Sequence, residues 1–202
     1  MRDNRDPLAE DLQAFVFANR GLLLAAPAAL LAAFGKPSAF SVAVGIPTAF
    51  AGELLRCWAV GYSGETTRND RVTAAKLVTA GPYAYVRNPL YLGNFITALG
   101  FAVAFTGKNK PFERFALTAG ALGVMAGLYA TIVPHEERYL QERFGDEFDR
   151  YCERVPRIVP QLEPAGDGAG EWDAGAIAQA ESKTFLTFGA MLALLALKSL
   201  AG

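Results

Sequence analysis

Long, mainly apolar stretches alternate with short polar segments along this chain. The apolar stretches cover about residues 15–35, 39–62, 89–107, 114–134 and 184–200. A membrane-spanning helix needs about 20 consecutive apolar residues, so the first four stretches predict spanning helices. The last stretch is short, and Lys198 can extend its ammonium group to the interface, so it is either a fifth span or a helix lying on the bundle. We expect an all-α fold, a polytopic membrane helix bundle of about five transmembrane helices.

The segment after the fourth stretch has a helical pattern of its own. Within residues 135–160, Leu140, Phe144, Phe148 and Tyr151 recur at helical spacing. Gly145 is expected to divide this segment into two short helices. The following residues are rich in glycine, alanine and acidic side chains. The predicted organisation is a membrane core at 1–160, a connector at 161–181 and a C-terminal helix at 184–200.

The fourth stretch is rich in small residues between 119 and 127, which permits close packing against a neighbouring helix. Composition agrees with a membrane protein, because hydrophobic residues make up 52% of the chain and are bunched. The net charge of −1 provides no basic surface for nucleic acid. The single histidine excludes a His-rich metal site, so no metal is expected, and two cysteines indicate no disulfide framework.

Lysine and arginine are unevenly distributed between the two sides that the predicted spans define. Most of the 19 basic residues fall on the side of the N-terminus, which includes the polar segments 63–88 and 135–183. Basic residues are enriched in cytoplasmic loops, so both segments are predicted to be cytoplasmic. We therefore expect an integral protein of the cell inner membrane, with its N-terminus in the cytoplasm.

Two ionisable residues lie inside the second predicted span. Glu53 and Arg56 are three positions apart and therefore share one helix face. A charge inside a membrane is costly and marks a functional candidate by default. The alternative is a mutual ion pair near the interface. We favour a functional role for Arg56.

Residues 81–93 form the most informative stretch of the chain. Gly81 and Pro82 favour a tight turn, and Asn88-Pro89 is typical of a helix N-cap followed by proline at the first helical position. The start of a helix suits an anionic group, and Arg87 adds a full positive charge. The alternative is a well-capped helix with an arginine that reaches to the interface.

Two separated blocks in this order resemble the signature of the integral-membrane methyltransferases, a group that includes isoprenylcysteine carboxyl methyltransferase and the phospholipid N-methyltransferases. The first block is Gly81-Pro82-Tyr83, Arg87-Asn88-Pro89, Tyr91 and Gly93, and the second is Glu136-Glu137, Phe144-Gly145, Phe148, Tyr151, Val155-Pro156-Arg157 and Pro160. The similarity covers about residues 50–160. Asn88 stands where the carboxyl methyltransferases usually have His, and an amide does not titrate near neutral pH.

The resemblance implies methyl transfer from S-adenosylmethionine to a lipophilic acceptor, either an isoprenylcysteine-like carboxylate or a lipid amine. The implied partners are a lipophilic or prenylated substrate and membrane lipids. Arg56 and Glu137 are the implied catalytic residues. The implied cofactor-binding residues are Gly81, Pro82, Tyr83, Arg87, Asn88, Pro89, Tyr91, Leu92, Gly93, Glu136 and Glu137.

Simpler interpretations exist for several of these residues. Glu136 and Glu137 also suit a charged first turn after Pro134, and Tyr83 and Tyr91 also suit an interfacial aromatic belt. Two other functions stay open. One is an NADPH-dependent membrane reductase of the sterol-reductase type, although such proteins are generally longer, and the other is a non-catalytic membrane scaffold.

Overall fold

The computed structural model of this chain describes residue 23 and residues 25–64, 76–166 and 168–201. Among them there are helices and loops but no strands, so the predicted all-α fold is confirmed. The elements are a short helix at Ala25–Phe34, α2 at Ala39–Ser63, η2 at Gly81–Ala84, α3 at Pro89–Phe105, α4 at Pro111–Phe144, α5 at Asp146–Arg154 and α6 at Ala174–Ala201.

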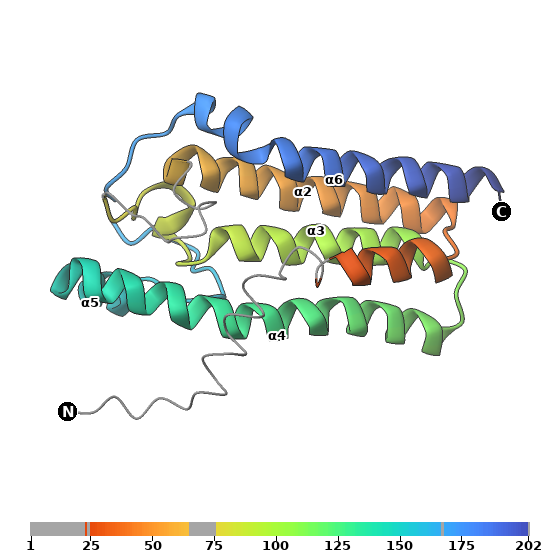
Figure 1. The fold of residues 1–202 in the computed structure, drawn as a ribbon, viewed down its shortest axis with the longest axis horizontal. Helices are drawn as coiled ribbons and strands as arrows, with labels where there is room; N and C mark the ends of the chain where they lie inside the picture. Colours follow the sequence, from red (N-terminus) through yellow and green to blue (C-terminus); the bar gives the residue numbers. More distant parts are fainter. Residues whose placement is uncertain (1–22, 24, 65–75, 167, 202) are drawn as a thin grey trace.

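The long helices lie side by side along the long axis of the molecule (Figure 1). α3 lies between α2 and α4, and α6 packs along α2. η2, α5 and the loop after α5 gather at one end of the bundle, and the C-terminus lies at the other. The motif segments that are far apart in the sequence therefore meet at a single end.

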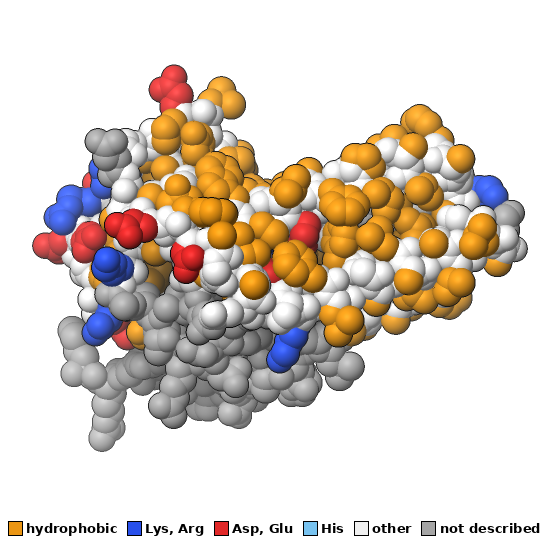
Figure 2. Space-filling model, turned by 90° about the horizontal axis from the view of Figure 1, so that it is seen from above, with side chains coloured by type: hydrophobic (Ala, Val, Ile, Leu, Met, Phe, Trp, Pro, Cys, Tyr) orange, Lys and Arg blue, Asp and Glu red, His pale blue; other side chains and the backbone are white. Residues whose placement is uncertain are grey.

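The outer surface of the bundle is that of a membrane protein. Three described helices, α2, α4 and α6, are long and apolar enough to cross a membrane, and α3 is apolar but has 17 residues. Large apolar side chains face outward along them, as in Phe40 (80% exposed) and Leu186 (76% exposed). Figure 2 shows hydrophobic side chains over much of one face, with charged side chains gathered at the loop end. The chain is an integral membrane protein.

The first of the two short helices predicted within residues 135–160 is not a separate helix, because α4 continues through Pro134 to Phe144. A proline within a helix removes one backbone donor, and side-chain contacts of Glu136 and Glu137 hold the next turn in place. The predicted break at Gly145 is confirmed. Its φ of 50° suits glycine, and its amide donates to the Gln141 carbonyl oxygen at 2.9 Å.

The C-terminal helix begins ten residues earlier than its apolar stretch indicates, at Ala174. The amide of Gly175 donates to the Asp173 carboxylate at 2.7 Å, which stabilises the first turn. Glu181 belongs to this helix and is 1% exposed, although in the sequence it looks like part of a polar connector. The predicted first span at 15–35 lies partly outside the described residues.

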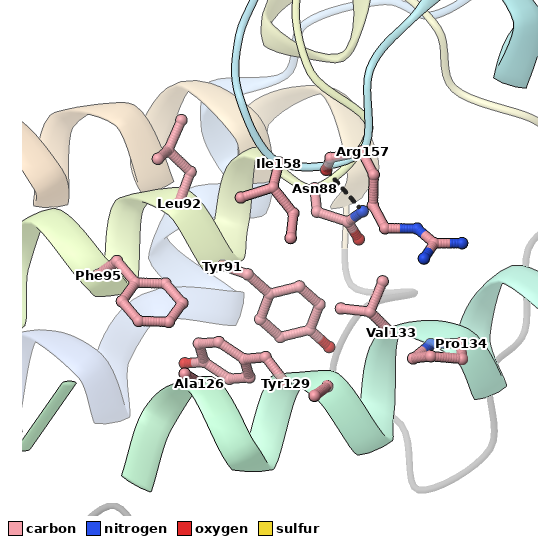
Figure 3. Close-up of a pocket in the computed structure, with 11 residues that line it drawn as sticks. Asn88, Tyr91, Leu92, Phe95, Ala126, Tyr129, Val133, Pro134, Arg157 and Ile158 are labelled. Carbon is pink, nitrogen blue, oxygen red and sulfur yellow. Dashed lines mark hydrogen bonds between the residues drawn. The ribbon is translucent and has the colours of Figure 1, made fainter. Parts of the chain in front are cut away.

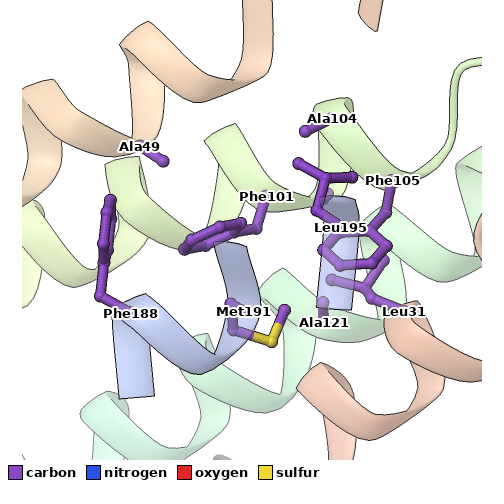
Figure 4. Close-up of a cluster of buried hydrophobic side chains, with 10 residues drawn as sticks. Leu31, Ala49, Phe101, Ala104, Phe105, Ala121, Phe188, Met191 and Leu195 are labelled. Atoms are coloured by element: carbon purple, nitrogen blue, oxygen red, sulfur yellow. The ribbon is translucent and has the colours of Figure 1, made fainter. Parts of the chain in front are cut away.

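Close packing occurs between α2 and α3, not along the small residues of α4. A Cβ atom built on Gly100 would meet the backbone nitrogen of Ala49, whereas one built on Gly123 would meet no atom of the described residues within 4 Å. Farther along the bundle, α3 and α6 share an aromatic core around Phe101, Phe105 and Phe188 (Figure 4). These contacts fix α3, on whose first turns the motif residues lie.

Candidate active site

The turn before α3 is shaped by Gly81 and Pro82. Gly81 has a φ of 59°, and a Cβ at this position would collide with the ring of Tyr62. Pro82 is buried, and its carbonyl oxygen accepts from the Val86 amide at 3.1 Å. Burial raises the pKa of Tyr83 in this turn to about 12, so its phenol stays neutral. The structure gives Gly81 and Pro82 a role in the conformation of the loop.

The segment after α5 wraps over this turn through backbone hydrogen bonds. The Arg87 amide donates to the Pro156 carbonyl oxygen at 2.8 Å, and the Gln161 amide donates to the Tyr85 carbonyl oxygen at 3.0 Å. The Tyr151 hydroxyl donates to the Tyr83 carbonyl oxygen at 2.8 Å. The two motif blocks therefore form one structural unit.

An ion cluster joins the same two blocks. Glu137 on α4 accepts from Arg87 at 3.0 Å and from the Arg157 Nε at 3.2 Å. The Nη1 of Arg87 donates to the carbonyl oxygens of Val155 at 2.7 Å and Cys152 at 3.2 Å. The side chains of Arg87 and Glu137 are each 12% exposed, and the hydrogen bond to Glu137 raises the pKa of Arg157. The resemblance implies that Arg87 and Glu137 bind the cofactor, and in the structure these two side chains contact each other.

Asn88 occupies the N-cap position of α3, with the buried Pro89 at the first helical position, but the side-chain cap predicted from the sequence is wrong. The Asn88 amide instead donates to the Arg157 carbonyl oxygen at 3.0 Å. The physical reason is its backbone, at φ −122° and ψ 58°, which differs from the extended conformation of a capping residue. Asn88 thereby ties α3 to the second block.

A cavity of about 340 Å³ lies between α3 and α4, next to these loops (Figure 3). It is lined mainly by apolar and aromatic side chains: Asn88, Tyr91, Leu92, Phe95, Ala126, Tyr129, Ala130, Val133, Pro134, Arg157 and Ile158. The rings of Tyr91 and Tyr129 approach to 4.3 Å between centroids. The Tyr91 hydroxyl donates to Glu136 at 2.8 Å, which connects the cavity to the acidic pair.

Arg56 lies deeper in the bundle and does not line this cavity. Its main partner is Glu181 on α6, whose two oxygens lie 2.9 and 2.8 Å from one guanidinium nitrogen. The Arg56–Glu53 ion pair, which the sequence suggested, has a longer distance of 3.8 Å between Arg56 Nε and Glu53 Oε2. Sequence reasoning missed Glu181, and its signal is an acidic residue about one helical turn before the apolar stretch that begins at residue 184. Asn94, which accepts from Arg56, was also missed.

The structure thus brings together only part of the predicted site. Asn88, Tyr91 and Leu92 line the cavity directly, and Glu136 reaches it through Tyr91. Gly93 faces α2, since a Cβ there would lie 2.6 Å from the Cγ of Arg56. Its contact is with the neighbouring helix.

The fold and the site define an integral-membrane helix bundle with a largely apolar cavity beside two joined motif loops. The chain belongs to the phospholipid methyltransferase family, whose model matches residues 40–147. The match includes all of α3 and α4 and nearly all of α2, and excludes α6.

Several curated proteins are similar to this chain. Protein-S-isoprenylcysteine O-methyltransferase B of Arabidopsis thaliana is 32% identical over 120 residues, which cover 57% of each chain. Protein-S-isoprenylcysteine O-methyltransferase of Schizosaccharomyces pombe is 33% identical over 117 residues, covering 55% of this chain and 46% of the relative. Cobalt-zinc-cadmium resistance protein CzcN of Cupriavidus metallidurans is 34% identical over 107 residues, covering 53% of this chain and 43% of the relative. The chain spans about half the length of the curated relatives it matches, and no solved structure gives a significant match.

Proposed function

We propose that this protein transfers a methyl group from S-adenosylmethionine to a lipophilic acceptor within the membrane. The observation that carries the proposal is the cavity between α3 and α4, which joins apolar walls to the polar motif loops. The family and the names of two similar proteins, both O-methyltransferases, support this reaction. S-adenosylmethionine supplies an already activated methyl group, so the protein needs chiefly to orient the acceptor and exclude water.

The residues at the loop end of the cavity fit this cofactor. The first turn of α3 has no side-chain cap from Asn88, so its amides and Arg157 can receive a carboxylate. Glu136 and Glu137 can accept from an ammonium or from ribose hydroxyls, and Tyr91 can form an aromatic wall. Arg87 holds Glu137 in position for this contact.

The remaining predicted residues support the same cofactor site indirectly. Gly81, Pro82 and Tyr83 shape the turn that precedes α3, and Pro89 begins the helix. Leu92 extends the wall toward the acceptor end, and Gly93 keeps α3 close to α2. Glu137 stays our candidate for a catalytic residue because it is the carboxylate shared by both motif blocks.

The acceptor site is proposed to be the apolar part of the cavity. Leu92, Phe95, Ala126 and Val133 line it, and Ala126 is exposed on α4. An isoprenoid or acyl chain can enter there from the bilayer without crossing the polar loops. An isoprenylcysteine-like carboxylate is the preferred acceptor, because it is already ionised at neutral pH and needs no base, and a lipid amine is the second candidate.

Calorimetry on the purified, detergent-solubilised protein tests the reaction class. We expect S-adenosylhomocysteine to bind and NADPH not to bind. Binding of NADPH alone would support a reductase, and binding of neither would support a non-catalytic scaffold. Transfer of a labelled methyl group to N-acetyl-S-farnesylcysteine or to phosphatidylethanolamine then separates the two acceptor classes.

A further inference from the structure

A line of side-chain contacts crosses four helices and ends at the cavity. Glu181 on α6 holds one terminal nitrogen of Arg56 on α2, and the other terminal nitrogen donates to the side-chain oxygen of Asn94 on α3. The Asn94 amide donates to the hydroxyl of Tyr129 on α4 at 2.7 Å. Tyr129 lines the cavity, whereas the other three residues do not.

In this line of contacts, each side chain fixes the orientation of the next one. The guanidinium is planar and its donors have fixed relative directions, so gripping one terminal nitrogen orients the other. An amide whose oxygen accepts from Arg56 presents its nitrogen as the donor toward Tyr129. The Arg56 side chain is 10% exposed and that of Glu181 is 1% exposed. Buried charges are costly, and a buried ion pair is weak evidence for stability, so a role in fixing geometry explains this pair better.

Tyr129 forms an aromatic wall of the cavity. Its ring lies 4.3 Å from Tyr91 and 5.5 Å from Phe95, between centroids. Figure 3 shows the three rings side by side along the cavity, with the Tyr129 hydroxyl directed away from Asn88 and Arg157. The contact with Asn94 therefore anchors the ring at the end opposite the loops.

We propose that Glu181, Arg56 and Asn94 are positioning residues that hold the Tyr129 ring and so set the fit of the cavity for an apolar acceptor chain. The identity of that acceptor rests on the proposed function, and the line of contacts does not. Glu181 lies outside residues 40–147, so α6 completes a site that the family match does not cover.

NMR of the detergent-solubilised protein, labelled with ¹³C at tyrosine Cζ, tests the line without a ligand. The resonance of Tyr129 is identified by its loss in Tyr129→Phe. We expect Glu181→Gln and Asn94→Ala each to shift it, and Glu171→Gln, the same change at an exposed glutamate, to leave it in place. Should Glu181→Gln fail to fold, the Asn94→Ala variant provides the test, because it leaves the Arg56–Glu181 ion pair intact. A Tyr129 resonance that stays in place in Asn94→Ala would overturn the proposal.

The effect on the cavity is measured as methyl transfer to N-acetyl-S-farnesylcysteine. Glu181→Gln and Tyr129→Phe should each raise the KM by about two- to tenfold, as expected for losing one hydrogen bond, with kcat and the affinity for S-adenosylhomocysteine little changed. The double variant should have a KM no higher than that of the single variant with the higher KM, because both substitutions act on the same ring. Additive effects would show that Glu181 does not act through Tyr129. If the unaltered protein transfers no methyl group, the proposed function fails. The NMR result still tests whether these side chains hold the Tyr129 ring.

Discussion

At the residue scale, Glu137 is the side chain on which the two motif blocks meet. It accepts from Arg87 at 3.0 Å and from Arg157, and its side chain is 12% exposed. A carboxylate between two guanidinium groups fixes the distance between α4, the turn before α3 and the segment after α5. Its role in any cofactor site therefore includes holding these segments together.

Glu137→Gln should lower both stability and affinity for S-adenosylhomocysteine. The amide keeps the shape but loses the charge that two arginines share, which costs up to about 1.5–3 kcal/mol. Thermal unfolding in detergent and calorimetry measure the two effects. Glu142→Gln, at an exposed position of the same helix, is the control and should change neither quantity. Normal stability in Glu137→Gln would contradict a structural role for the cluster.

Asn88 allows a test of whether hydrogen bonding or capping matters at the start of α3, because its side chain donates to a carbonyl oxygen instead of capping the helix. Asp caps helices as well as Asn does, but a carboxylate cannot donate to the Arg157 carbonyl oxygen. We expect Asn88→Asp to destabilise the protein at least as much as Asn88→Ala, by about 0.5–1.5 kcal/mol in thermal unfolding. An Asn88→Asp variant as stable as the unaltered protein would show that capping dominates.

At the element scale, contact between α2 and α3 determines where the motif residues lie. These helices approach closely at glycines and alanines, as expected in a membrane, where association depends on packing. The small residues of α4 look equivalent in the sequence, yet Gly120, Gly123 and Gly127 have open space beside them among the described residues. A small-residue pattern marks a possible contact, and the fold selects which contact forms.

Gly100→Ala and Gly123→Ala form a matched pair that tests this difference. The new methyl group at Gly100 would collide with the backbone of α2, so we expect a loss of about 1–3 kcal/mol in stability. At Gly123 the same change meets no described residue and should be neutral or stabilising by about 0.5–1 kcal/mol. Thermal unfolding in detergent measures both variants. Equal effects would place the tight helix contact elsewhere.

At the scale of the whole molecule, the bundle separates a polar end from an apolar body. η2, α5 and the loop after α5 gather at one end, and the short connection between α3 and α4 lies at the other (Figure 1). From the distribution of basic residues we propose that the polar end faces the cytoplasm, where a soluble cofactor would be available.

Cysteine labelling in intact cells tests this orientation, in a background with Cys57 and Cys152 replaced by serine. An impermeant maleimide should label Lys110→Cys from outside and should not label Asp146→Cys, because the two exposed positions lie at opposite ends of the bundle. Permeabilised cells, in which both positions should react, are the control. Labelling of Asp146→Cys in intact cells would place the motif loops outside the cytoplasm.

The sequence alone determined the features that depend on nearby residues. Apolar stretches predicted the helices of the bundle, Gly145 predicted the break between α4 and α5, and Asn88-Pro89 predicted the start of α3. Leu140, Phe144, Phe148 and Tyr151 pack together in one cluster, as their helical spacing indicated. These features follow from hydrophobicity and backbone preference, which act over one or two helical turns.

Only the tertiary structure decided the partners of the charged groups. Arg56 meets Glu181 across 125 positions, and Arg87 meets Glu137 across 50. A charge near a membrane must be neutralised or hydrogen-bonded, but which group does so depends on which helices are neighbours. The sequence therefore identified Arg56 as costly, and the position of α6 beside α2 determined that Glu181 neutralises it.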